Sequence, residues 1–163
     1  MKTFCFTIDD NIRFLRDLTR ENPESLFDNP YLAMLKRLHD GYGVKIQLNL
    51  FYQASDFDLS TVSERYAPEW ESCADWLKLS FHSLRESVNP YENSDYAELF
   101  SDCSAANAQI LRFASGASLA KTTTLHYCLT TGEGVRALSD CGVFGLLGLF
   151  GTSDRPHSSY SLG

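Results

Sequence analysis

The sequence lacks the features that mark several large protein classes. No stretch approaches the ~20 consecutive apolar residues that a membrane-spanning helix needs, so we expect no membrane segment. Basic residues are in the minority, with 14 Lys and Arg against 21 Asp and Glu, which argues against nucleic-acid binding because phosphate contacts need a basic surface. Acidic residues follow the first few residues closely, so no signal peptide is predicted.

The sequence also lacks paired cysteines. The number of cysteines is odd and none forms a CxxC pair, which excludes a disulfide framework or a zinc knuckle. Free cysteine is among the most buried residue types, so we expect buried, reduced thiols in a cytoplasmic protein. The cysteines are Cys5, Cys73, Cys103, Cys128 and Cys141. Nucleotide-binding glycine loops and the GxSxG elbow of serine hydrolases are absent as well.

The chain that remains has ordinary globular properties. Its 163 residues are 44% apolar and 21% charged, with a net charge of −7, which is enough for one domain with its own core. We expect that domain to span residues 1–150 and to be followed by an irregular polar tail, 151–163.

Strand-like and helix-like segments alternate along the chain. We expect strands at 2–8, 44–51, 77–81, 122–129 and 143–150. We expect helices at 29–40, 60–76 with a break near Pro68, 93–113 and 133–139. Strands separated by helices predict a parallel sheet, and right-handed crossovers bring its carboxyl ends to one edge. A closed eight-unit barrel needs ~250 residues, so the prediction is an α/β domain of about five βα units, either an open sheet or a partial barrel.

The fifth predicted strand is apolar throughout and therefore needs cover on both faces. No helix follows it in the sequence. Two alternatives remain open: the chain is a piece of a longer domain, or the surface is covered in a homo-oligomer.

Two adjacent carboxylates, Asp9 and Asp10, follow the apolar run Phe4-Cys5-Phe6 where the first strand is expected to end. Neighbouring strand residues point to opposite faces, so one acid can bind a cation while the other accepts a proton. Ligands of parallel α/β folds gather at the carboxyl ends of the strands, which places the pair where chemistry is expected. Such a pair is also often a helix cap or a solvated turn.

Other strand ends carry histidines. His82 follows the third strand, His126 lies in the fourth, and Glu86 comes four residues after His82. If the chain turned helically after His82, these two side chains would face one point. Imidazole and carboxylate ligands suit zinc, iron or another divalent first-row metal. Each residue also has an ordinary interpretation, as a core histidine or a surface acid, but together they supply the parts of a metal-assisted hydrolase.

Phe6-Thr7-Ile8-Asp9-Asp10 resembles the T-F-D-D motif of the polysaccharide deacetylase (NodB-homology) superfamily, and a strand ending in His82-Ser83 fits the same order of elements. The resemblance implies a partial or distorted (β/α) barrel that uses a divalent metal to remove acyl groups from carbohydrate amides. It further implies that Asp9 is the general base, that Asp10 binds the metal, and that His82 is the first histidine of the H-x-x-x-H motif.

The sequence departs from that family pattern in several places. Asn11 replaces the usual glycine, Glu86 replaces the second histidine, and His126-Tyr127 stands where an R-x-P-Y segment is usual. The late L-x-H motif is missing. The implied metal site therefore consists of Asp10, His82 and His126, or includes Glu86. The pattern is typical of a divergent branch or of one that has lost activity.

The leading interpretation is therefore a zinc-dependent hydrolase acting on an amino-sugar amide or ester, with Tyr127 or Tyr91 as a donor to the oxyanion. A second interpretation is a non-catalytic protein on the same scaffold that binds a carbohydrate or a protein partner. Aromatic side chains near the strand ends would then stack on sugar rings, namely Tyr52, Phe81, Tyr91 and Tyr127.

A third interpretation is a doubly wound, receiver-like domain, which also has an acidic pair after its first strand. It is disfavoured because His82 stands where the phosphate-accepting aspartate is expected and no lysine ends the fifth strand.

Overall fold

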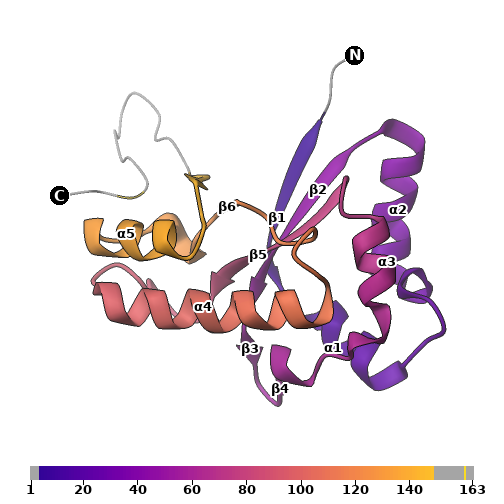
Figure 1. Cartoon of the computed structure of the whole chain (residues 1–163), viewed down its shortest axis with the longest axis horizontal. Helices are drawn as coiled ribbons and strands as arrows, with labels where there is room; N and C mark the ends of the chain where they lie inside the picture. The colour runs from indigo at the N-terminus through magenta and orange to yellow at the C-terminus, as the bar shows by residue number, and fades with distance from the viewer. Residues whose placement is uncertain (1–3, 149–159, 161–163) are drawn as a thin grey trace.

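The computed structural model describes residues 4–148 and Tyr160 (Figure 1). Its centre is a parallel sheet in the order β1-β2-β5. The strands are β1 (Cys5–Asn11), β2 (Lys45–Phe51) and β5 (Leu77–Ser83). Doubly wound domains such as receivers place the first strand between the second and the third, whereas here β2 lies in the middle. The chain therefore winds in one direction, which does not fit the receiver-like interpretation.

Two short strands lie beyond this sheet. β6 (Thr122–Thr123) pairs in parallel with β7 (Gly145–Leu146). A parallel bridge between Leu79 and Leu119 joins the segment before β6 to β5. The fold is therefore mixed α/β with a small parallel sheet, and within residues 4–148 it forms no closed barrel.

The connections contain helices and a hairpin. The α-helices are α1 (Arg13–Glu21), α2 (Pro30–Tyr42), α3 (Ala67–Ser72), α4 (Tyr96–Phe113) and α5 (Gly132–Asp140). The 3₁₀ turns are η1 (Leu26–Asp28), η2 (Leu59–Thr61), η3 (Glu64–Tyr66) and η4 (His126–Cys128). The hairpin after β2 consists of β3 (Gln53–Ala54) and β4 (Phe57–Asp58). In the described part of the chain, no helix combines the length and the apolar character needed to cross a membrane.

The second predicted segment, a helix from residue 29, is confirmed together with its cap. The Asn29 Oδ1 accepts hydrogen bonds from the amides of Tyr31 at 3.1 Å and Leu32 at 3.2 Å, and Pro30 occupies the first helical position, where its missing N–H costs nothing. The helix ends at Gly43, whose φ of 65° is readily adopted by glycine.

The two faces of β2 differ in character, and this difference positions the site. Ile46, Leu48 and Leu50 are buried in the main apolar core. That core receives side chains from four helices, including Leu15, Leu35, Trp70 and Ile110. Gln47 and Asn49 alternate with these apolar residues and are buried on the opposite face. The face away from the helices therefore carries polar groups.

Two helical predictions need correction. Residues 13–21, for which no helix was predicted, form α1, because Phe14, Leu15 and Leu18 provide a buried stripe. The helix expected over 60–76 is only α3, preceded by the turns η2 and η3. Pro68 lies in the first turn of α3, so it begins this helix instead of interrupting a longer one.

The fourth and fifth strands are shorter than predicted. The strand expected over 122–129 ends at Thr123, because Tyr127 and Cys128 have φ values of 63° and 55° and turn the chain out of an extended path. Within the described residues, the strand expected over 143–150 covers only β7. The predicted tail lies outside the described residues except for Tyr160, whose hydroxyl accepts from the Leu125 amide at 3.1 Å.

The expectation of buried thiols is correct for three of the five cysteines. Cys73, Cys103 and Cys128 are buried, whereas Cys141 is half-buried and Cys5 is exposed.

Candidate metal centre

The carboxyl ends of the strands carry the predicted acids and histidines. Asp9 and Asp10 lie near the end of β1, His82 near the end of β5, and His126 in η4. Since β1 and β5 flank β2, these side chains approach the same sheet edge from opposite sides.

A bulge near the end of β1 aims Asp10. The β1–β2 register shifts between Ile8 and Asn11, and Asp10 has a φ of 60°. The Asn11 side-chain amide donates to the carbonyls of Ile8 at 2.7 Å and Asp9 at 3.0 Å. The side chain of Asn11 thus provides hydrogen-bond donors to two backbone carbonyls at the bulge, where the β1–β2 register is interrupted. Bulges often redirect side chains next to functional sites, and Asn11 gives this one a specific stabilising contact.

Asp10, His82 and His126 form a compact group that could hold a metal ion. The Asp10 Oδ1 lies 3.2 Å from the His82 Nε2 and 3.2 Å from the His126 Nδ1, and the two nitrogens are 3.1 Å apart. The histidines are buried, whereas the Asp10 side chain is 62% exposed. The group is therefore anchored in the protein on one side and open to ligands on the other.

A backbone carbonyl fixes the orientation of His82. Its Nδ1 lies 2.5 Å from the carbonyl oxygen of Thr124. Because a carbonyl oxygen only accepts, Nδ1 carries the proton, and the lone pair of neutral His82 is on Nε2. Metal-binding histidines are commonly oriented by such a contact on their other nitrogen.

The surroundings of His126 favour its neutral form. Burial lowers its pKa, and the neighbouring His82 lowers it further, while Asp10 acts in the opposite direction. Its Nε2 is buried and has no hydrogen-bond partner among the described residues. The Nδ1 faces Asp10 and His82, so in the Nε2–H tautomer its lone pair points into the group.

The spacing of these three atoms suits a shared cation. A metal ~2.0–2.1 Å from each ligand holds the ligand atoms about 3.0 Å apart at right angles and about 3.4 Å apart at tetrahedral angles. The observed separations of 3.1–3.2 Å fall between these values. Three lone pairs at this distance repel each other unless a proton or a metal lies between them, so the residues fit a divalent metal.

The other two predicted site residues lie outside this group of three. Asp9 accepts a hydrogen bond on Oδ1 from the Asn49 side chain at 2.6 Å. Glu86 is exposed in an irregular segment, not the helical turn that would have brought it to His82. It does line a cavity that also includes Asp10. The charges of both acids reach His126, where they tend to raise its pKa. Their predicted roles as base and ligand stay predictions.

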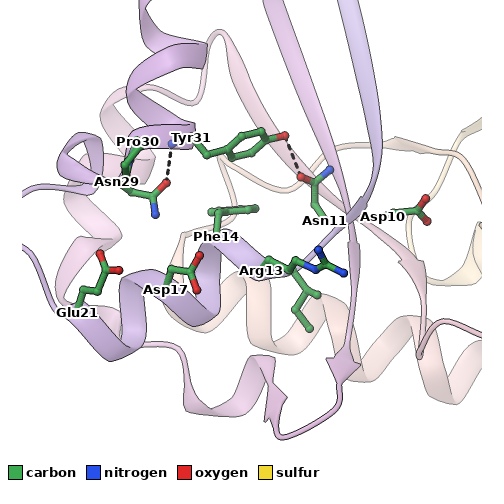
Figure 2. A pocket seen from close by; sticks show the side chains of 10 residues that line it. Asp10, Asn11, Arg13, Phe14, Asp17, Glu21, Asn29, Pro30 and Tyr31 are labelled. Atoms are coloured by element: carbon green, nitrogen blue, oxygen red, sulfur yellow. Dashed lines mark hydrogen bonds between the residues drawn. The ribbon is translucent and has the colours of Figure 1, made fainter.

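Two hollows flank Asp10. One, of about 450 Å³, lies between α1 and α2, and Figure 2 shows Asp17 and Glu21 along it, with the Asp10 carboxylate pointing away from both. There the Tyr31 hydroxyl donates to the Asn11 Oδ1 at 2.9 Å. The other hollow, of about 630 Å³, includes Phe51, whose ring lies 5.3 Å from that of His82 and 5.0 Å from that of His126. Neither histidine lines this second hollow, but Asp10 and the Phe51 ring connect it to both of them.

The aromatic residues predicted for sugar or oxyanion contacts separate into two groups. Phe81 and Tyr91 are buried, and the Tyr91 hydroxyl donates to Asp102 at 3.0 Å, so neither is available to a ligand. Tyr127 is 52% exposed, and its ring lies 4.4 Å from that of His126. Tyr52 is partly buried against the core.

Sequence reasoning missed the polar layer behind the site. Asn49 is the centre of this layer. Its amide nitrogen donates to Asp9, and its Oδ1 accepts from Gln47 at 2.7 Å and from the Ser80 hydroxyl. Polar residues alternating with apolar ones in a buried strand were the available signal. Arg13 was missed because the segment that contains it was not predicted to be a helix.

Comparison with protein-family models, curated proteins and solved structures found no match for the chain. Any proposal about its activity therefore depends on the fold and on the chemistry of this site.

Proposed function

We propose that the protein is a metal-dependent hydrolase that removes an acyl group from an amino-sugar amide or a related ester. The observation that carries this proposal is the triangle of Asp10, His82 and His126, with ligand atoms 3.1–3.2 Å apart. Three protein ligands of this kind leave coordination positions open, which is the arrangement of catalytic rather than structural sites.

Zinc is the metal that we propose. Two neutral imidazole nitrogens and one carboxylate oxygen are a common zinc ligand set, although iron and other first-row metals accept the same ligands. A bound divalent metal supplies Lewis acidity, which polarises a carbonyl and makes a water molecule easier to deprotonate.

Asp9 is the proposed base. It lies one residue from Asp10. Among the described residues, Asp9 accepts a side-chain hydrogen bond only on Oδ1, from the Asn49 amide, which leaves Oδ2 to accept a proton from the attacking water. The short hydrogen bond to a buried amide also fixes the orientation of the carboxylate. In this scheme Asp10 and the histidines bind, and Asp9 moves the proton.

The order of the strands supports the deacetylase-like interpretation. β1, β2 and β5 follow each other in sequence and in space, and the bridge to Leu119 continues this order towards β6 and β7. Winding in one direction is what a partial (β/α) barrel requires, with its ligands at the carboxyl ends of the strands. We therefore propose that the domain is a divergent part of such a barrel.

A specific observation favours a second candidate, a non-catalytic protein that binds a carbohydrate. Departure of an amine requires an acid, and among the described residues the remaining histidine, His39, stacks on Trp76 with ring centroids 4.4 Å apart, its Nδ1 2.9 Å from the Val44 carbonyl oxygen. No third imidazole therefore faces the site within that part of the chain. Exposed Tyr127 beside His126 provides a ring on which a sugar can stack.

Metal analysis tests the proposal. Purified protein incubated with zinc and desalted should retain about one equivalent of metal. Asp10→Asn should lower the affinity at least ~10–100-fold, the loss typical of disturbing even a supporting residue. Asp40→Asn is the matched control and should retain the metal, because Asp40 pairs with Lys36 on the surface of α2, away from the three proposed ligands. Equal retention by all three proteins, or by none, contradicts the metal site.

The two candidate functions are separated by acetate release from N-acetylated amino sugars. The hydrolase should release acetate only when it holds metal, and Asp9→Asn should stop release while leaving the metal content intact. Sugar binding that survives chelation, without acetate release, would instead support the non-catalytic protein.

A further inference from the structure

The hollow beside the histidines includes two arginines of α1 in its lining. Its volume is about 630 Å³, and its lining includes Asp10, Arg13, Arg16, Phe51 and Glu86. Because Asp10 belongs both to this lining and to the metal group, a molecule in the hollow lies next to the proposed metal. The charges on the wall therefore act on whatever reacts there.

Arg13 is a cation without an internal partner. It is exposed, and no hydrogen bond or ion pair joins its guanidinium to another residue in the described part of the chain. Figure 2 shows it at the start of α1, beside Asn11 and Asp10. The Arg13 guanidinium therefore has donors to offer to a molecule in the cavity.

Arg16 lies one turn further along α1 and lines the same hollow. Its guanidinium is 3.2 Å from the Asp17 Oδ1, and its side chain is 33% exposed. Asp17 belongs to the lining of the other hollow, towards α2. The ion pair therefore orients Arg16 and leaves further N–H donors free for a second acceptor.

The two hollows differ in the balance of their charges. The hollow towards α2 has three acids, Asp10, Asp17 and Glu21, with Arg13 as its only cation. The hollow beside the histidines has two arginines and two acids, and one of these acids, Asp10, would be neutralised by a bound metal. With the metal bound, the second hollow carries an excess of positive charge and attracts an anion, whereas the first hollow repels it.

We propose that the substrate carries an anionic group, a carboxylate or a phosphate, which binds Arg13 and Arg16 while its acyl group faces Asp10, His82 and His126. This inference rests on the proposed hydrolase and specifies its substrate class. The planar guanidinium presents a pair of donors that match the two oxygens of such a group. The anion also fixes which end of the substrate lies at the metal, since Arg13 and the proposed metal ligand Asp10 line the same cavity.

Titration calorimetry with three N-acetylated sugars tests the inference. The probes are N-acetylglucosamine 6-phosphate, N-acetylmuramic acid, which bears a carboxylate, and uncharged N-acetylglucosamine. We expect at least one anionic probe to bind roughly tenfold or more tightly than the uncharged sugar, and the better of the two identifies the anion. Arg13→Gln should remove that advantage, Arg16→Gln should reduce it, and raising the salt concentration should weaken it.

Arg37→Gln is the matched control, because Arg37 is an exposed residue of α2 that lines neither hollow. It should leave binding of all probes unchanged, and circular dichroism should show each variant folded. If the anionic and neutral probes bind equally, if neither anionic probe binds at millimolar concentration, or if Arg13→Gln keeps the advantage, the inference is wrong.

The same titration on Asp10→Asn separates this inference from the proposed function. An anion advantage that persists in this variant and disappears in Arg13→Gln supports the arginine site whatever the metal analysis shows. A normal metal content combined with no anion advantage would overturn the inference and leave the proposed hydrolase standing.

Discussion

Asn49 controls how Asp9 is presented. Asn49 is fully buried, and its amide group both donates to Asp9 and accepts from Gln47 and Ser80. A buried amide with partners on both sides cannot rotate without losing hydrogen bonds, each worth about 1 kcal/mol net and more when the partner is charged. The carboxylate of Asp9 is therefore supported by a rigid donor.

Replacing Asn49 by Asp tests this support. Asn49→Asp keeps the shape of the side chain. It replaces the Asn49 Nδ2, which donates to the Asp9 Oδ1 at 2.6 Å, by a carboxylate oxygen. Two carboxylates that share a site retain one proton to higher pH. We expect the acid limb of the acetate-release profile to move up by at least ~1 pH unit, and carbon NMR of the carboxyl groups to show the same shift without an assay of activity.

Gln47→Glu is the control for this substitution. It also introduces a carboxylate into the buried polar layer, but Gln47 has no hydrogen bond to Asp9. Its stability should fall, whereas the acid limb should stay in place. An equal shift in both variants would show that the added charge acts generally and that Asn49 has no specific role.

For single residues, the sequence predicted the acids and histidines at strand ends but few of the residues that hydrogen-bond to them. Asp10 and His82 were found because carboxyl ends of parallel strands meet at one edge. His126 was found although it was predicted to lie in a strand over 122–129. In the structure it lies in the turn η4, at the position where that strand was expected to continue. Asn49 and Arg13 were missed, because their importance depends on contacts with residues about 40 positions away or with a cavity that no local pattern reveals.

The contact between α4 and α5 depends on the absence of a side chain at Gly134. A Cβ on this buried glycine would overlap the Thr130 Oγ1 and lie 2.8 Å from the Leu99 Cδ2. Helix backbones approach this closely only where one residue is small, so Gly134 sets the spacing of the two helices. Those helices cover the second apolar cluster, which also contains Phe81, the neighbour of His82.

Gly134→Ala should lower the free energy of unfolding by ~1–3 kcal/mol, the usual cost of overpacking. The matched control is Gly41→Ala in α2, where nothing lies within 4 Å of the added methyl group. Alanine favours a helix by ~0.5–1 kcal/mol over glycine, so the control should be slightly more stable than the original chain. Urea unfolding measures both, and a Gly134→Ala variant of undiminished stability would show that α4 and α5 can separate freely.

Elements with a strong local signal were predicted well. The Asn29-Pro30 start defines α2, although the helix continues past its predicted end at residue 40 through Gly41 to Tyr42, and the apolar alternation of 44–51 defines β2. α1 was missed because it is short and its N-cap, Ile12, makes no side-chain capping hydrogen bond. The end of β6 depends on tertiary contacts, so the spacing of apolar residues in the sequence does not predict it.

For the whole molecule, the proposed metal would join parts of the chain that are otherwise connected through the sheet. Its ligands come from β1, β5 and η4. A ligand that binds only the folded state stabilises it in proportion to the logarithm of its concentration, by ~2.7 kcal/mol at a hundredfold excess over the Kd. Folding stability and metal binding should therefore be linked.

Metal removal tests this linkage. A chelator should lower the Tm of the metal-loaded protein, and added zinc should restore it. Asp10→Asn should melt at the same temperature with and without metal, while Asp40→Asn should respond like the original chain. A chelator effect of the same size in Asp10→Asn would indicate that zinc acts elsewhere, for example on the exposed thiol of Cys5.

The spacing of the proposed ligands along the chain has a consequence for the time course of folding. Asp10 and His82 are 72 residues apart, and His82 and His126 are 44 apart. Contacts between such distant residues form late, because closing long loops costs entropy that only a nearly complete structure recovers. A metal held there would therefore leave the folding rate almost unchanged and would slow unfolding instead, so that the bound ion would set how long each folded molecule lasts.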